Sequence, residues 1–282
     1  IDDAVYSSFE LNRFSFNQSK YINSYIDYEE YSLSGRRFQR TWIEPCSKLS
    51  NFEFTENSGV FDPGIGAVHP VKIEIKDSDG NTSVLEFSVE GKYREIQAQL
   101  KEYVDEFECG RVNQFKTEDF IIELPADALY NNLRFQYQSK EATNGFYSDI
   151  SEIHNKTVPL HQPAVIGIKT KNLEEQFQQK ALLVNINPET GKFTAAGGYY
   201  ENGWVAAEIN RFGNYAVCID TIPPAILPLS ITNKNTLTEA NRIRFEITDD
   251  LAGIENIEGL IDGIWALFEY DAKSSTITHY FD

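Results

Sequence analysis

The four histidines of this chain, His69, His154, His161 and His279, are the first residues to consider for metal binding or proton transfer. Zinc sites need such ligands at a local spacing, as in H-x-H or H-E-x-x-H. Only His154 and His161 lie near each other, and a proline-containing loop separates them. We therefore expect ordinary loop histidines and no zinc site.

The three cysteines, Cys46, Cys109 and Cys218, are far apart and form no C-x-x-C pair, so they indicate neither a zinc knuckle nor a thioredoxin motif. Cys218 alternates with apolar residues and is expected to be a small buried hydrophobe. One disulfide with one free thiol is equally compatible with the sequence. No G-x-S-x-G motif is present and no pair among the 43 acids stands out, so the sequence predicts no catalytic site.

Two acidic turns could hold calcium, which prefers carboxylate and carbonyl oxygens. Asp77 and Asp79 lie in DSDGN at 77–81, and Asp249 and Asp250 begin DDLAG at 249–253. In the first turn glycine stands at position four, whereas an EF-hand needs it at position six. Asp, Asn and Gly are also the residues that a tight turn requires. Both interpretations, a turn and a calcium site, stay open at this stage.

Three aromatic residues flank an Asn-Gly turn in YYENGW at 199–204. Tyr199, Tyr200 and Trp204 could stack against sugar rings. Aromatic residues in strands more often pack across the sheet or into the core. The segment is therefore a candidate carbohydrate-binding surface, with core packing as the alternative.

The elements that would position these residues are mainly strands. The strict alternation at 71–75 and 84–89, on either side of an Asp-Gly turn, predicts a β-hairpin. Short strands punctuated by turn residues at near-regular spacing between 111 and 220 predict a sandwich or barrel. Residues 92–110 are the best helix candidate, because four apolar residues share one helical face: Tyr93, Ile96, Leu100 and Val104.

A strand pattern at 211–219 ends at DTIPP, residues 220–224, and a new strand pattern begins at Ala225. Two adjacent prolines cannot both lie in a central strand, but they can stiffen an extended connector. The sequence thus predicts an all-β chain of tandem β-sandwich modules, immunoglobulin-like at both ends. We expect an immunoglobulin-like sandwich at 1–91, a larger β-sandwich at 92–220 and a truncated immunoglobulin-like module at 221–282.

The net charge of −18 argues against nucleic acid and anionic membranes as partners, because both attract Lys and Arg. No apolar run is long enough to cross a membrane, and no signal peptide is recognisable. The chain begins at Ile1 and contains no methionine. We therefore expect a fragment or a processed product.

Several stretches resemble the region that follows the catalytic domain in large lysostaphin-like (LytM-type) zinc endopeptidases of Gram-negative gut anaerobes. The similarity covers nearly the whole chain. It is carried by FSF at 14–16, YINS at 21–24, IDYEEY at 26–31, RTWIEP at 40–45, residues 121–130, Gly197-Gly198 with Gly203-Trp204, residues 212–224, and the tail from IDG at 261–263 to FEYDAK at 268–273.

In that family, a His and an Asp from H-x-x-x-D and a His from H-x-H hold zinc, and the enzyme cuts peptide cross-links of peptidoglycan. No position here matches either motif, so no catalytic or zinc-binding residue is carried over. The resemblance implies a non-catalytic accessory region, exported to the periplasm or cell surface, whose partner is a peptidase domain upstream of Ile1. An independent carbohydrate- or peptidoglycan-binding protein is the alternative.

Overall fold

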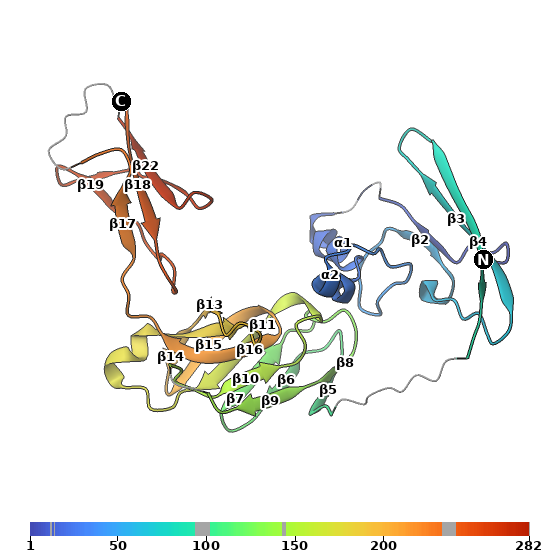
Figure 1. Cartoon of the computed structure of the whole chain (residues 1–282), viewed down its shortest axis with the longest axis horizontal. Coiled ribbons are helices and arrows are strands. Elements are labelled where there is room, and N and C mark those ends of the chain that lie inside the picture. Colours follow the sequence, from blue (N-terminus) through green and yellow to red (C-terminus); the bar gives the residue numbers. More distant parts are fainter. Residues whose placement is uncertain (12, 14, 94–101, 143–144, 233–240, 282) are drawn as a thin grey trace.

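The computed structural model describes residues 1–282 except 12, 14, 94–101, 143–144, 233–240 and 282. The chain is all-β, with several small antiparallel sheets that are consistent with tandem β-sandwich modules, as the sequence predicts (Figure 1). The division at 91 and 220 into three modules stays a prediction. No described helix is long and apolar enough to span a lipid bilayer.

The N-terminal segment combines short helices with two separate two-stranded sheets in its described part, fewer strands than the roughly seven of an immunoglobulin-type domain. Short helices cover YINS and residues 28–31 of IDYEEY. The residue pattern at 38–44, before Pro45, predicts a strand, but among the described residues this segment makes only the isolated bridge between Gln39 and Ile26. The elements are β1 (Ser7–Phe9), α1 (Ser19–Ser24), α2 (Tyr28–Ser34), β2 (Phe52–Thr55), β3 (Val68–Lys76) and β4 (Thr82–Glu90), with 3-10 turns at Phe16–Gln18 and Glu56–Gly59.

The hairpin of β3 and β4 confirms the alternation seen in the sequence, and its nine pairs run without a bulge from Val68 opposite Glu90 to Lys76 opposite Thr82. The helix predicted at 92–110 is wrong at its C-terminal end, where Asp105–Phe107 forms strand β5 against β8 (Leu133–Phe135). That long-range pairing overrides the local helical spacing. Ile96 and Leu100 lie outside the described residues.

The central sandwich packs two five-stranded antiparallel sheets face to face. One sheet has the order β13 (Phe193–Gly197), β12 (Ala181–Ile186), β16 (Gly213–Ile219), β10 (Ile150–Ile153) and β9 (Tyr137–Lys140). The other has the order β14 (Tyr199–Glu201), β15 (Trp204–Arg211), β11 (Pro159–Lys169), β7 (Phe120–Leu124) and β6 (Asn113–Lys116). The 3-10 turn Glu175–Lys180 leads into β12.

Both sheets contribute to the main core, with Ile122, Ile166 and Val205 from one and Leu183 and Val217 from the other. Strand β12 is buried on both of its faces, because the alternate residues Leu182, Val184 and Ile186 form a second cluster with Ala216 and Cys218. Cys218 is 7% exposed and unpaired, as predicted. The outer face of this sheet therefore carries apolar side chains that are themselves buried under neighbouring residues.

The C-terminal segment is a four-stranded antiparallel sheet with a small hairpin beside it. The sheet order is β17 (Ala225–Pro228), β18 (Arg242–Thr248), β22 (Thr276–Tyr280) and β21 (Glu269–Asp271), and the hairpin is β19 (Gly259–Ile261) with β20 (Ile264–Ala266). Residues 220–224 lie between β16 and β17 outside any strand, as the double proline predicts.

Candidate functional site

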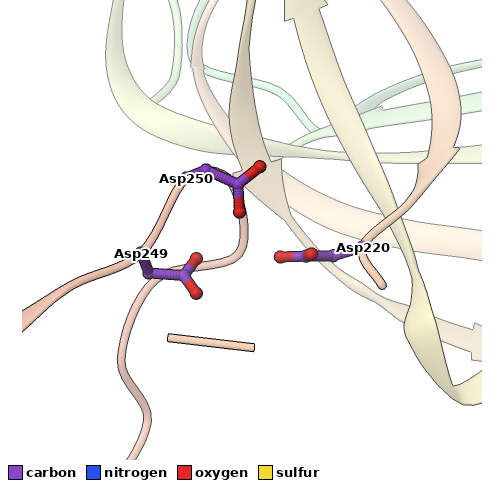
Figure 2. Close-up of side chains that lie close together, drawn as sticks. All are labelled: Asp220, Asp249 and Asp250. Atoms are coloured by element: carbon purple, nitrogen blue, oxygen red, sulfur yellow. The ribbon is translucent and has the colours of Figure 1, made fainter. Parts of the chain in front are cut away.

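The acidic turn at 249–253 lies where the central sandwich meets the C-terminal segment. Leu251 packs against the outer cluster of β12 and β16, next to the residues of β16 that lead into the connector. This contact brings the turn to Asp220, the residue directly after β16. One carboxylate oxygen each of Asp220, Asp249 and Asp250 lies within 4.8 Å of the others. Figure 2 shows the three side chains converging on one space.

Backbone amides hold two of these carboxylates in place. Asp220 accepts hydrogen bonds from the backbone N–H of Ile222 (3.0 Å) and, across the junction, of Ala252 (2.8 Å). Asp249 Oδ2 accepts from the N–H groups of Leu251 (3.1 Å) and Gly253 (2.7 Å). The Asp249 and Asp250 turn is thus both an ordered turn and one part of a three-carboxylate cluster.

The donor set defines which ions the cluster can hold. It consists of carboxylates alone, and hard cations such as calcium take oxygen ligands, whereas zinc sites in proteins use His and Cys as well. Calcium binds six to eight oxygens, so water and backbone carbonyls would have to complete the shell. Asp250 is exposed and makes no hydrogen bond to the described residues, which leaves both of its oxygens available to a cation.

The other acidic turn is explained by its own hydrogen bonds. Asp77 accepts from the backbone N–H groups of Asp79 (3.0 Å) and Asn81 (2.8 Å) and from the Asn81 side chain (2.9 Å). These bonds, the Asn81 side chain first, lower the pKa of Asp77. In the described part of the chain, neither Asp77 nor Asp79 belongs to a cluster of three metal-ligating groups.

The aromatic candidates divide between the two faces of their sheet. Tyr200 pairs with Val205 and packs against the main core, so it is a structural residue. Tyr199 is 63% exposed and pairs with Ala206, whereas Trp204 pairs with Glu201. Because paired residues point to the same side and alternate residues share a face, Tyr199 and Trp204 lie together on the outer face. A Cβ at Gly167 would touch the Trp204 ring at 3.6 Å, so the ring lies over this glycine.

A third cluster, which the sequence did not suggest, joins the N-terminal segment to the central sandwich. The ring of Tyr21 in α1 stacks on His161 at 4.0 Å and meets Tyr130 edge-on at 5.9 Å. The Tyr130 hydroxyl lies 2.9 Å from His161 Nδ1. Burial, and secondarily the charge of Lys20, lower the pKa of His161, which favours the neutral imidazole.

Polar and covalent bonds surround this joint. The disulfide links Cys46 of the N-terminal segment to Cys109 of the sandwich, and Cys218 is a free thiol. Of the alternatives that the sequence left open, the structure therefore has one disulfide with one free thiol. Lys48 forms an ion pair with Asp127 at 2.8 Å. Lys20 Nζ donates to the His161 carbonyl at 3.2 Å. The joint is therefore a fixed contact and not a free linker.

Comparison with known proteins finds a similarity for the central part of the chain. Residues 105–220 match the family model of a Zu5-like domain. The match begins at β5 and ends at Asp220, so it spans the central sandwich. No curated protein matches the chain.

Proposed function

We propose that this chain is a non-catalytic accessory region of an exported cell-wall metalloendopeptidase, which positions or regulates a peptidase domain upstream. The observation that carries the proposal is the Cys46–Cys109 disulfide. Such bonds persist in oxidising compartments such as the periplasm or cell surface and are rare in the cytosol. The resemblance of the sequence to the region after the catalytic domain of LytM-type enzymes is the reason for proposing this family.

The two joints support a positioning role. At the first, a disulfide and the Tyr21, Tyr130 and His161 contacts join the N-terminal segment to the sandwich. At the second, Ala252 bonds to Asp220 and Leu251 packs on the outer cluster. Modules held by such contacts keep a fixed spacing, which a region that orients a peptidase on the wall would need.

Metals enter the proposal in two places. Zinc would be held by the parent peptidase, whose motifs this chain does not contain. Calcium would bind at Asp220, Asp249 and Asp250, where it would neutralise three converging charges and tie the C-terminal segment to the sandwich. Its role here would be structural.

The residues encoded directly before Ile1 test the proposal. We expect an H-x-x-x-D and an H-x-H motif there, on a domain that cuts cross-linked peptidoglycan. The present chain alone should release no muropeptides from the same substrate. If the upstream region lacks both motifs, or the isolated chain cleaves cross-links itself, the assignment as an accessory region is wrong.

The second candidate function is glycan binding by the outer face that carries Tyr199 and Trp204. The observation in its favour is the ring of Trp204 lying over Gly167, next to an exposed tyrosine, since flat aromatic faces stack on sugar rings. Trp204→Ala should then abolish retention of the chain by insoluble peptidoglycan in a pull-down. Trp265→Ala, which removes a 65% exposed tryptophan of β20, is the matched control and should leave retention unchanged. Equal retention of both variants, or no retention of the wild type, would exclude a lectin role.

A further inference from the structure

The ribbon formed by β3 and β4 has one apolar and one polar face. Register places Val71 opposite Phe87 and Ile73 opposite Leu85, with Ile75 beyond them on the same face. Ile73, Ile75, Leu85 and Phe87 are 43%, 68%, 58% and 42% exposed. Exposed apolar patches of this kind mark interaction sites on soluble proteins. Figure 1 shows the ribbon extending from the N-terminal segment.

The ladder identifies the backbone groups that point away from the ribbon. The backbone N–H of Asp77 donates to the carbonyl of Asn81, and the backbone N–H of Gly91 donates to the carbonyl of Ala67. Residues 77 and 81, and residues 67 and 91, are therefore hydrogen-bonded pairs of the ladder. Antiparallel pairs alternate between bonded and non-bonded. The outward residues of β4 are therefore Thr82, Val84, Glu86, Ser88 and Glu90. No other strand in the described part of the chain pairs with them.

The two edges of the ribbon differ in how well they are protected. On β3 the outward residues include Pro70, which has no N–H, and its carbonyl already accepts a bond from Asp2 at 3.1 Å. Lys72 and Lys76 occupy two further outward positions on the same strand. Proline and lysine are the residues that protect natural sheet edges from pairing. Strand β4 contains neither, so its edge is the open one.

The charged residues next to the open edge of β4 indicate which kind of strand can pair with it. Glu86 and Glu90 lie on the polar face of β4. Glu90 pairs with Lys92 at 3.3 Å, whereas Lys72, opposite Glu86, pairs with Glu74 at 3.3 Å and not with Glu86. An added strand would place its polar residues beside these two carboxylates and its apolar residues beside Leu85 and Phe87. A basic strand is favoured over a second copy, because this chain carries a net charge of −18.

We propose that β4 binds an extended segment of a partner protein in which Lys or Arg alternates with apolar residues, by adding it as a third strand to the ribbon. Main-chain hydrogen bonds would supply affinity and the alternating side chains specificity, as in other strand-addition interfaces. The added strand would widen the apolar face and pair a cation with Glu86, and a second cation beside Glu90 would compete with Lys92 for that carboxylate. The edge would act in this way whichever of the two functions above the chain has.

The probe is a blocked peptide of nine residues, the length of β4, in which lysine alternates with valine, and its binding to the full chain is followed by fluorescence anisotropy. We expect saturable binding. A peptide of the same composition with its lysines in one block and its valines in another should bind about tenfold more weakly or worse, because it cannot match both faces. Equal binding of the two peptides would indicate general attraction to an acidic chain and would overturn the proposal.

Matched variants locate the edge. Ser88→Pro removes a backbone N–H that points away from the ribbon on β4, and Glu86→Lys reverses a side-chain charge on the polar face of the same strand. Each should weaken binding of the alternating peptide about tenfold or more. Lys72→Pro and Glu74→Lys make the same two changes on β3 and should leave binding unchanged. NMR chemical shifts of the β3–β4 ladder report that each variant keeps the hairpin. Loss of binding with the β3 variants alone, or a dimer that dissociates on Ser88→Pro, would contradict a partner strand at β4.

Discussion

Replacing both Cys46 and Cys109 by alanine will lower the free energy of unfolding of the unit formed by the N-terminal segment and the central sandwich by about 4 kcal/mol. The disulfide joins residues separated by 63 positions, and closing a loop of that length restricts the unfolded chain by about this amount. Among the described residues, the buried apolar members of the joint's core cluster are Tyr21, Leu49 and Tyr130, a small core, so we expect the loss of the covalent link to weaken the joint.

Urea unfolding followed by tryptophan fluorescence measures this loss, with Trp42 in the N-terminal segment and Trp204 in the sandwich as reporters. Reduction of the wild type by dithiothreitol should reproduce the effect of the double substitution. The same reductant should not change the midpoint of the double variant, which is the control. An unchanged midpoint for the reduced wild type would mean that the bond does not stabilise the joint.

Calcium should stabilise the junction between the sandwich and the C-terminal segment through Asp220, Asp249 and Asp250. At a dissociation constant of about 1 mM, in the range of extracellular modules, about 10 mM calcium would add about 1.4 kcal/mol to the free energy of unfolding. Thermal unfolding with and without calcium measures this gain. Magnesium should have a smaller effect, because it demands a smaller octahedral shell.

Asp250→Asn should change the stability of the protein in opposite directions in the absence and in the presence of calcium. Without calcium the variant should be slightly more stable than the wild type, because it relieves repulsion among three carboxylates and breaks no hydrogen bond to the described residues. With calcium it should be less stable than the wild type, because a charged ligand is missing. Asp79→Asn in the other acidic turn is the matched control and should respond to calcium as the wild type does. A calcium response retained by Asp250→Asn would exclude the site.

The central strands and the hairpins could be predicted from the sequence, because the alternation and the turn residues that indicate them are close together in the chain. Asn202 and Gly203 both have positive φ, at 49° and 87°, which is the geometry that an Asn-Gly hairpin turn requires. The segment 38–44 shows where alternation misleads. Arg40 there forms ion pairs with Asp27 and Glu44, and in the described part of the chain the segment joins no sheet beyond the single bridge from Gln39 to Ile26.

The candidate metal cluster could be predicted only in part. Asp249 and Asp250 stand out as neighbours in a turn, whereas Asp220 is remote in sequence and joins them only through packing of Leu251 on the sandwich. The available signal was its position at the start of the DTIPP connector, three residues before the first of the two prolines. The Tyr21, Tyr130 and His161 joint had no such signal, because its members come from three distant segments.

The disulfide also determines how the chain would bear mechanical load. If the two ends of the protein are pulled apart, as happens to a molecule attached between two points of a cell surface, tension passes from Cys46 directly to Cys109 through the sulfur atoms. Residues 47–108 lie off that path. The ribbon of β3 and β4 falls within this sheltered loop, so force on the ends would not unzip its strands. The edge of β4 would keep its shape while the rest of the chain is stretched.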